Sequence, residues 1–178
     1  MPNEASELEL SAQDLHAVAR YAAESAQEAL PIFEATHPGD RRPRIAVEAA
    51  WTFAQGAERT QLQRSSALAA HKAAQEATTE AARDAARAAG HAAAAAYLHP
   101  LARSHQVKHI LGAAAHAARA AELAAGEDRS VGSARLEQAR QRATPALVAV
   151  LRRYPAAPSS GNRVAELMSA LDTSLRSL

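Results

Sequence analysis

Residues 81–96 read AARDAARAAGHAAAAA, and eleven of these sixteen positions are alanine. The same bias extends over the whole chain, which has 50 alanines among 178 residues but only 7 glycines and 3% aromatic residues. Alanine loses no side-chain entropy in a helix and ranks first in helix propensity, whereas the aromatic residues that favour strands are scarce. The composition therefore predicts an all-α protein.

Capping signals and apolar spacing divide the chain into helices. Ser11 with Asp14, and Thr60 with Gln63, are typical of helix starts, and Pro31 is expected to end or kink the first helix. The expected helices begin near residues 11, 43, 60, 81, 104, 134, 145 and 162, with a polar connection at 128–133. Seven or eight helices with short loops predict a compact orthogonal or solenoid-like bundle.

The last expected helix carries an apolar stripe that should pack against the bundle. Its members follow helical spacing and are Val164, Leu167, Met168, Leu171 and Leu175. The chain length fits one domain, so we expect a flexible N-terminus at residues 1–10 and a single helical domain at residues 11–178.

Several function classes are disfavoured by composition. The chain has no cysteine, which removes disulfides and thiolate metal sites and suits a reducing cytoplasm. No run of about 18 apolar residues exists to span a bilayer, and the first ten residues lack the order of a signal peptide. We therefore expect a cytoplasmic protein without a membrane partner.

Charge is distributed unevenly along the chain, although the net charge is only +1. Residues 1–34 carry seven acids and one base, a net charge of −6, and residues 129–178 carry eight arginines and three acids, a net charge of +5. Such a dipole can steer a charged partner, and the candidate partner-facing acids are Glu24, Glu28 and Glu34. Solvated helix faces are the alternative explanation. A nucleic-acid partner is disfavoured, since such binders are usually more basic and carry aromatic platforms.

No enzyme motif is present. The sequence lacks a Gly-rich phosphate loop, a serine nucleophile elbow and a His-Glu-x-x-His pair, so we expect no catalytic residue and no cofactor. The conspicuous residues are eight histidines, five of them between His91 and His116. They could serve helix packing, a ligand or metal pocket, or catalysis. Because no Asp or Glu lies between Asp84 and Glu122, packing is favoured over a metal site.

Three short sequence segments are similar to one another: Ala-Ala-His71-Lys-Ala-Ala, Ala-Gly-His91-Ala-Ala-Ala and Ala-Ala-His116-Ala-Ala-Arg. Chance explains such matches easily in a chain this rich in alanine, and internal duplication is the alternative.

Four histidine-containing words carry a family resemblance: Leu-Ala-Ala-His71, Ala-Ala-Gly-His91, Tyr-Leu-His99-Pro and His109-Ile-Leu-Gly. With residues 149–155 and 163–168, they resemble an immunity-protein family of actinobacterial polymorphic-toxin systems, a relative of immunity family five. The resemblance implies a small cytoplasmic protein that neutralises a cognate toxin by stoichiometric binding. It also makes these four histidines the candidate shared cluster or ligand pocket. The alternative function is a small-molecule or metal-binding protein, such as an antibiotic-sequestering protein, with a pocket lined by the same histidines.

Helix geometry allows a more specific prediction for this cluster. If the helices on either side of the 97–101 corner are antiparallel, His91 and His109 lie at similar distances from the corner and should face each other. His71 should approach from the preceding helix, while His99 stays near the corner. Without a nearby acid, we expect the buried rings to contact each other or backbone carbonyls instead of a tightly bound metal.

Overall fold

Eight α-helices and two short 3-10 turns make up 74% of the residues that the computed structural model describes, which are 6–159 and 161–178. No strand occurs in these two ranges. The α-helices are α1 (Ala12–Thr36), α2 (Arg42–Ala54), α3 (Gln61–Glu76), α4 (Glu80–Ala94), α5 (Val107–Ala124), α6 (Arg129–Arg142), α7 (Pro145–Leu151) and α8 (Arg163–Arg176). The turns are η1 (Ala95–Tyr97) and η2 (Ser104–Gln106). The predicted all-α class is confirmed.

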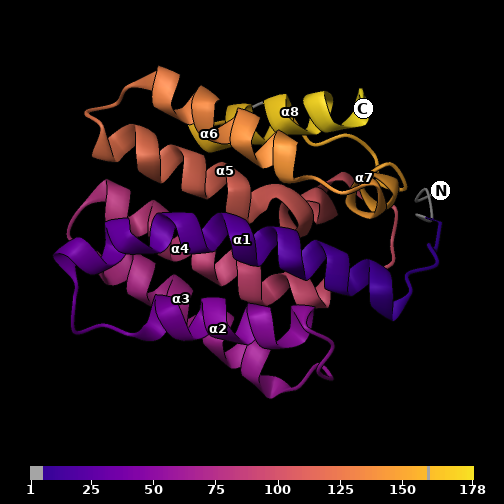
Figure 1. Ribbon diagram of the computed structural model, residues 1–178, viewed down its shortest axis with the longest axis horizontal. Coiled ribbons are helices and arrows are strands. Elements are labelled where there is room, and N and C mark those ends of the chain that lie inside the picture. Colours follow the sequence, from indigo (N-terminus) through magenta and orange to yellow (C-terminus); the bar gives the residue numbers. More distant parts are fainter. Residues whose placement is uncertain (1–5, 160) are drawn as a thin grey trace.

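The helices form layers around α1, α4 and α5. In Figure 1, α1 crosses the front of the molecule with α4 behind it, α2 and α3 lie below, and α5, α6 and α8 lie above. Helix α4 packs against α1, α3 and α5, and α5 also packs against α6 and α8. The chain therefore builds the bundle outward on both sides of α1 and α4 (Figure 1).

Most helix starts follow local capping chemistry. Ser11 and Asp14 form the predicted capping box of α1, and Thr60 and Gln63 form that of α3. Asn162 caps α8 by accepting a hydrogen bond from the backbone N–H of Ala165.

One of the two alternatives for Pro31 is excluded, and one boundary prediction was wrong. Pro31 does not end α1, because the helix continues to Thr36 and the flanking Leu30 and Phe33 are buried in the core. Their burial outweighs the loss of one backbone hydrogen bond. The expected connection at 128–133 is instead the first turn of α6, since the side chain of Asp128 accepts from the Ser130 N–H and caps that helix.

Residues 6–8 lie against the segment between α4 and α5. The Leu8 N–H donates to the carbonyl of Pro100, and Glu7 forms an isolated antiparallel bridge with Leu101. Of the N-terminus that we predict to be flexible, residues 1–5 lie outside the described residues.

Small side chains dominate the core. Buried alanines line the surfaces of α1, α4 and α5 that face one another, and the larger residues are concentrated at a few positions such as Phe33, Ile110 and Leu147. Leu167, Leu171 and Leu175 of α8 are buried as predicted, while Val164 and Met168 of the same stripe are partly exposed. In the part of the chain that is described, the helices lack the combination of length and apolarity needed to cross a membrane.

Candidate functional site

Three histidine rings form a row across the neighbouring helices α3, α4 and α5. The centroids of the His71 and His91 rings are 5.2 Å apart, with the planes nearly perpendicular. The His91 and His116 rings stack with centroids 4.9 Å apart and an interplanar angle of 15°. Each helix contributes one ring, so the ring contacts lie where α3 packs against α4 and where α4 packs against α5.

Two glycines make room for this row. A Cβ atom on Gly90 of α4 would lie only 2.6 Å from Nε2 of His71, and one on Gly112 of α5 would lie 3.0 Å from Nδ1 of His91. Each ring therefore occupies space that only glycine leaves free on the next helix.

An acidic residue completes the row at the α5 end. Nδ1 of His116 lies 2.7 Å from Oδ1 of Asp84, and both side chains are largely buried. Because a carboxylate only accepts hydrogen bonds, His116 donates through Nδ1. The expectation that no acid lies near the histidines was therefore wrong. Asp84 precedes His91 by two helical turns on α4, whose packing on α5 brings it to His116.

Burial keeps the first two rings neutral. It lowers the pKa of His91 well below its ordinary value, and the neighbouring His116 and His71 lower it further. The pKa of His71 is also lowered, first by burial and then by the charges of His116, Arg87 and Lys108. Neutral imidazoles can stack at these distances without charge repulsion, which fits a packing role.

The other two candidate histidines lie outside the row. His99 is exposed, and only its backbone is engaged, with its carbonyl accepting from the Tyr154 hydroxyl. His109 is partly buried, and its buried Nδ1 has no hydrogen-bond partner among the described residues. Burial, together with the charges of Lys108 and His105, lowers the pKa of His109 to about 4.

The sequence analysis placed His109 opposite His91, and the ring that stacks on His91 is that of another α5 histidine. His116, two turns further along α5, takes that place and stacks on His91. Residues 95–97, just before the corner at 97–101, form the turn η1 and do not continue α4. The number of residues counted from the corner therefore does not give the height at which α4 and α5 pack against each other.

The row does not have the form of a metal centre. Within residues 6–159 and 161–178 there is no group of three or more His, Asp or Glu side chains that could hold a metal ion. A tightly bound zinc usually requires at least three protein ligands in one tetrahedral shell.

Beside Asp84, a charged cleft of about 190 Å³ opens between α4, α5 and the start of α8. Its lining includes four arginines and two acids: Arg83, Arg87, Arg119, Arg163, Glu80 and Asp84. None of the four candidate histidines lines it.

Beneath the cleft lies Glu122, which is completely buried and hydrogen-bonded by Arg163 and Arg119. Burial alone would raise the pKa of Glu122, but these hydrogen bonds and charges hold it below the ordinary value. The carboxylate is therefore ionised and anchors α8 to α5.

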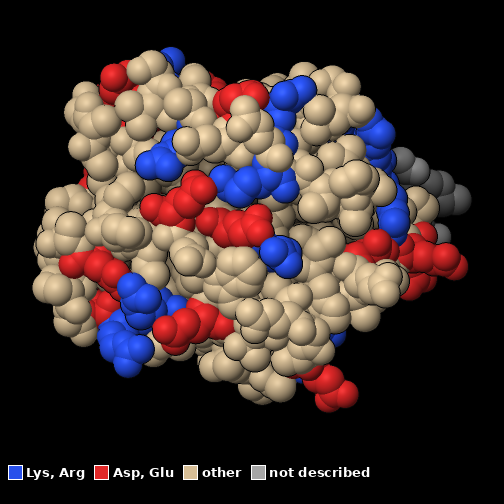
Figure 2. Space-filling view, in the orientation of Figure 1, with Lys and Arg blue, Asp and Glu red and all other residues tan. Residues whose placement is uncertain are grey.

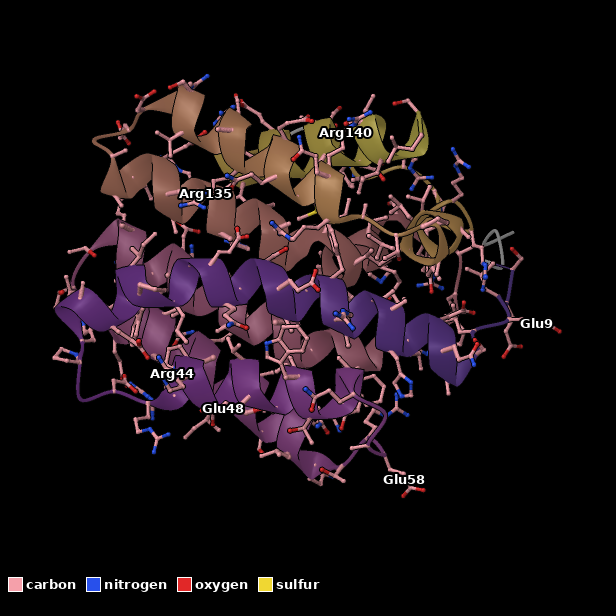
Figure 3. All side chains as sticks on the ribbon, in the orientation of Figure 1. Glu9, Arg44, Glu48, Glu58, Arg135 and Arg140 are labelled. Atoms are coloured by element: carbon pink, nitrogen blue, oxygen red, sulfur yellow. The ribbon has the colours of Figure 1, made fainter. Side chains whose placement is uncertain are left out.

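The three acids proposed to face a partner already have partners within the chain. Glu34 pairs with Arg44 at 2.7 Å, and Glu28 pairs with Arg142 at 2.7 Å. Glu24 pairs with Arg20 at 3.1 Å. Acidic and basic side chains accordingly alternate over this face in Figure 2. In Figure 3, Arg135 and Arg140 extend from α6 on one side of α1, and Arg44 extends from α2 on the other.

Comparison with known families decides the relationship of the chain. The family model described as Imm-5 like putative immunity protein matches residues 8–146. The chain belongs to this family. The matched region includes α1 to α6 and the whole histidine row, whereas the cleft also depends on α8, which lies beyond it. Searches of curated proteins and of solved structures returned no match for this chain.

The four candidate histidines chosen from the sequence did not include His116, and Asp84 was not chosen either. The signal that could have found His116 is the similarity of the three Ala-x-His segments, which contain the three histidines of the row, one on each of three consecutive helices. Asp84 has no comparable signal, because its role depends on how α4 packs against α5.

Proposed function

We propose that this immunity-family protein neutralises a cognate protein toxin by binding it one to one and covering a surface that the toxin needs. The family match over residues 8–146 carries this proposal. An all-helical body with ion-paired faces and an open arginine cleft is compatible with recognition of a folded partner.

The arrangement of the histidines supports a binding protein over a metal- or ligand-sequestering protein. His71 and His91 fill space above glycines of adjacent helices, and neither lines the cleft beside Asp84. In this proposal the row sets the spacing of α3, α4 and α5 and makes no contact with the toxin.

The test uses a toxin domain from a gene adjacent to the gene for this protein, which is first identified by sequencing the surrounding locus. Co-expression should restore growth of cells that produce the toxin domain, and calorimetry should give a one-to-one complex. Protection that persists at a large molar excess of toxin would mean catalytic inactivation and would contradict the proposal. Absence of any complex would contradict it as well.

A further inference from the structure

The arginines of the cleft differ in how many of their hydrogen-bond donors have a partner within the chain. Arg119 and Arg163 donate to the buried Glu122, whereas Arg83 makes neither an ion pair nor a side-chain hydrogen bond with any described residue. Arg87 has only Asp84, at 3.8 Å, which is beyond hydrogen-bond distance. Two guanidinium groups on one side of α4 therefore retain their donors for another molecule.

Little negative charge competes for these donors. Of the two acids in the lining, Asp84 is engaged by His116, and Glu80 forms no ion pair with a described residue. The first turn of α8 also borders the cleft, with Asn162, Arg163 and Val164 in its lining. Guanidinium groups bind carboxylates with two parallel hydrogen bonds, and this geometry favours an anionic group in the cleft.

An apolar groove of about 550 Å³ adjoins the cleft and shares Leu123 with it. The groove lies where the end of α1, the start of α4 and the end of α5 meet, and Ile32 and Ala81 contribute to its lining. Arginine anchors beside an apolar pocket are the composition that dominates binding energy in protein interfaces.

We propose that the toxin docks on this surface, placing a carboxylate side chain between Arg83 and Arg87 and an apolar side chain in the groove beside Leu123. The occupant is a protein with an acidic residue next to an apolar one, as the charge of the cleft and the apolar groove together require. This inference rests on the proposed function for the identity of the partner. It assigns the contact to α4, α5, the start of α8 and the end of α1, and not to the ion-paired acids Glu24, Glu28 and Glu34.

The first experiment measures, by calorimetry, the affinity for the toxin domain identified as described above. Arg83→Gln/Arg87→Gln removes two charges without adding repulsion, and the dissociation constant should rise at least about 30-fold, equivalent to about 2 kcal/mol. Ala81→Gln puts a polar side chain into the groove without altering charge and should also weaken binding. Circular dichroism must show that the variants remain folded.

The matched control is Arg103→Gln/Lys108→Gln. Both residues are exposed near the start of α5, at the end away from the cleft, and neither makes an ion pair with a described residue. The two substitutions remove the same charge as the cleft variant. This control should change affinity by less than about threefold, as expected for charges outside an interface. Equal weakening by control and cleft variants would overturn the proposal, and so would loss of affinity only in Glu24→Gln/Glu28→Gln.

The second experiment does not depend on the toxin. In an NMR titration with the blocked peptide acetyl-Glu-Leu-Glu-amide, the side-chain N–H signals of Arg83 and Arg87 should shift, and acetyl-Lys-Leu-Lys-amide should leave them unchanged. Peptide shifts confined to the cleft without toxin binding would refute the proposed function alone. An affinity for the toxin that the cleft substitutions leave unchanged would refute this inference alone. Stronger shifts with a single-stranded DNA oligonucleotide would overturn the assignment of a protein occupant.

Discussion

Replacement of Gly90 by alanine tests whether the histidine row holds the helices at their present spacing. The substitution would normally stabilise a helix interior by about 1 kcal/mol. Here the new Cβ would lie 2.6 Å from Nε2 of His71, whose ring is flanked by His91 at 5.2 Å and cannot turn freely toward it. Overpacking of this kind costs about 2–3 kcal/mol, so Gly90→Ala should lower the free energy of unfolding by about 1–2 kcal/mol.

The sign should reverse when the ring is absent. In a His71→Ala background the clash disappears and only the helix propensity remains, so Gly90→Ala should stabilise by about 1 kcal/mol. The coupling between the two positions is then about 2–3 kcal/mol. Gly39→Ala is the control, since no atom lies within 4 Å of its Cβ position, and its effect should stay within about 0.5 kcal/mol.

Urea unfolding of the four proteins in this cycle, followed by circular dichroism at a pH where histidine is neutral, measures the coupling. If Gly90→Ala stabilises the wild-type protein as much as it stabilises the His71→Ala variant, the coupling is zero. The ring would then move aside without cost, and our reasoning about helix spacing would be refuted.

Three further predictions concern stability. Leu171→Ala should lower the free energy of unfolding by about 2–5 kcal/mol because the side chain is 1% exposed, and an unchanged urea midpoint would show that α8 is not part of the core. Glu122→Gln should cost about 2 kcal/mol, while Glu166→Gln, at an exposed partner of the same Arg163, should cost less than about 0.5 kcal/mol. The Glu122 contribution should be present above its unfolded pKa and disappear as acid protonates the folded carboxylate, which urea titrations at several pH values would reveal. Because the pKa of His109 falls from 6.5 to about 4 on folding, stability should decrease as pH drops from 6.5 to 4, by up to about 3 kcal/mol, and His109→Gln should flatten that decrease.

Local chemistry in the sequence was sufficient to predict the helices. The capping boxes at Ser11 and Thr60 and the side-chain cap at Asn162 each satisfy backbone N–H groups within three residues, so nothing distant is needed to specify them. The alanine content likewise predicts the fold class, because helix propensity acts on each residue separately. Family membership was also accessible, through words that contain His71, His91 and His109.

Tertiary packing decided which of these residues meet. His91 stacks on His116 and not on His109 because the level at which α4 and α5 cross depends on glycines and on the turn that joins the helices. Asp84 reaches His116, 32 positions away in sequence, by the same crossing. The acids of α1 similarly acquire arginine partners from α2 and α6. A helix surface made of alanines has only shallow ridges and grooves. The relative placement of these helices is therefore determined by the few large side chains and the glycines against which they pack.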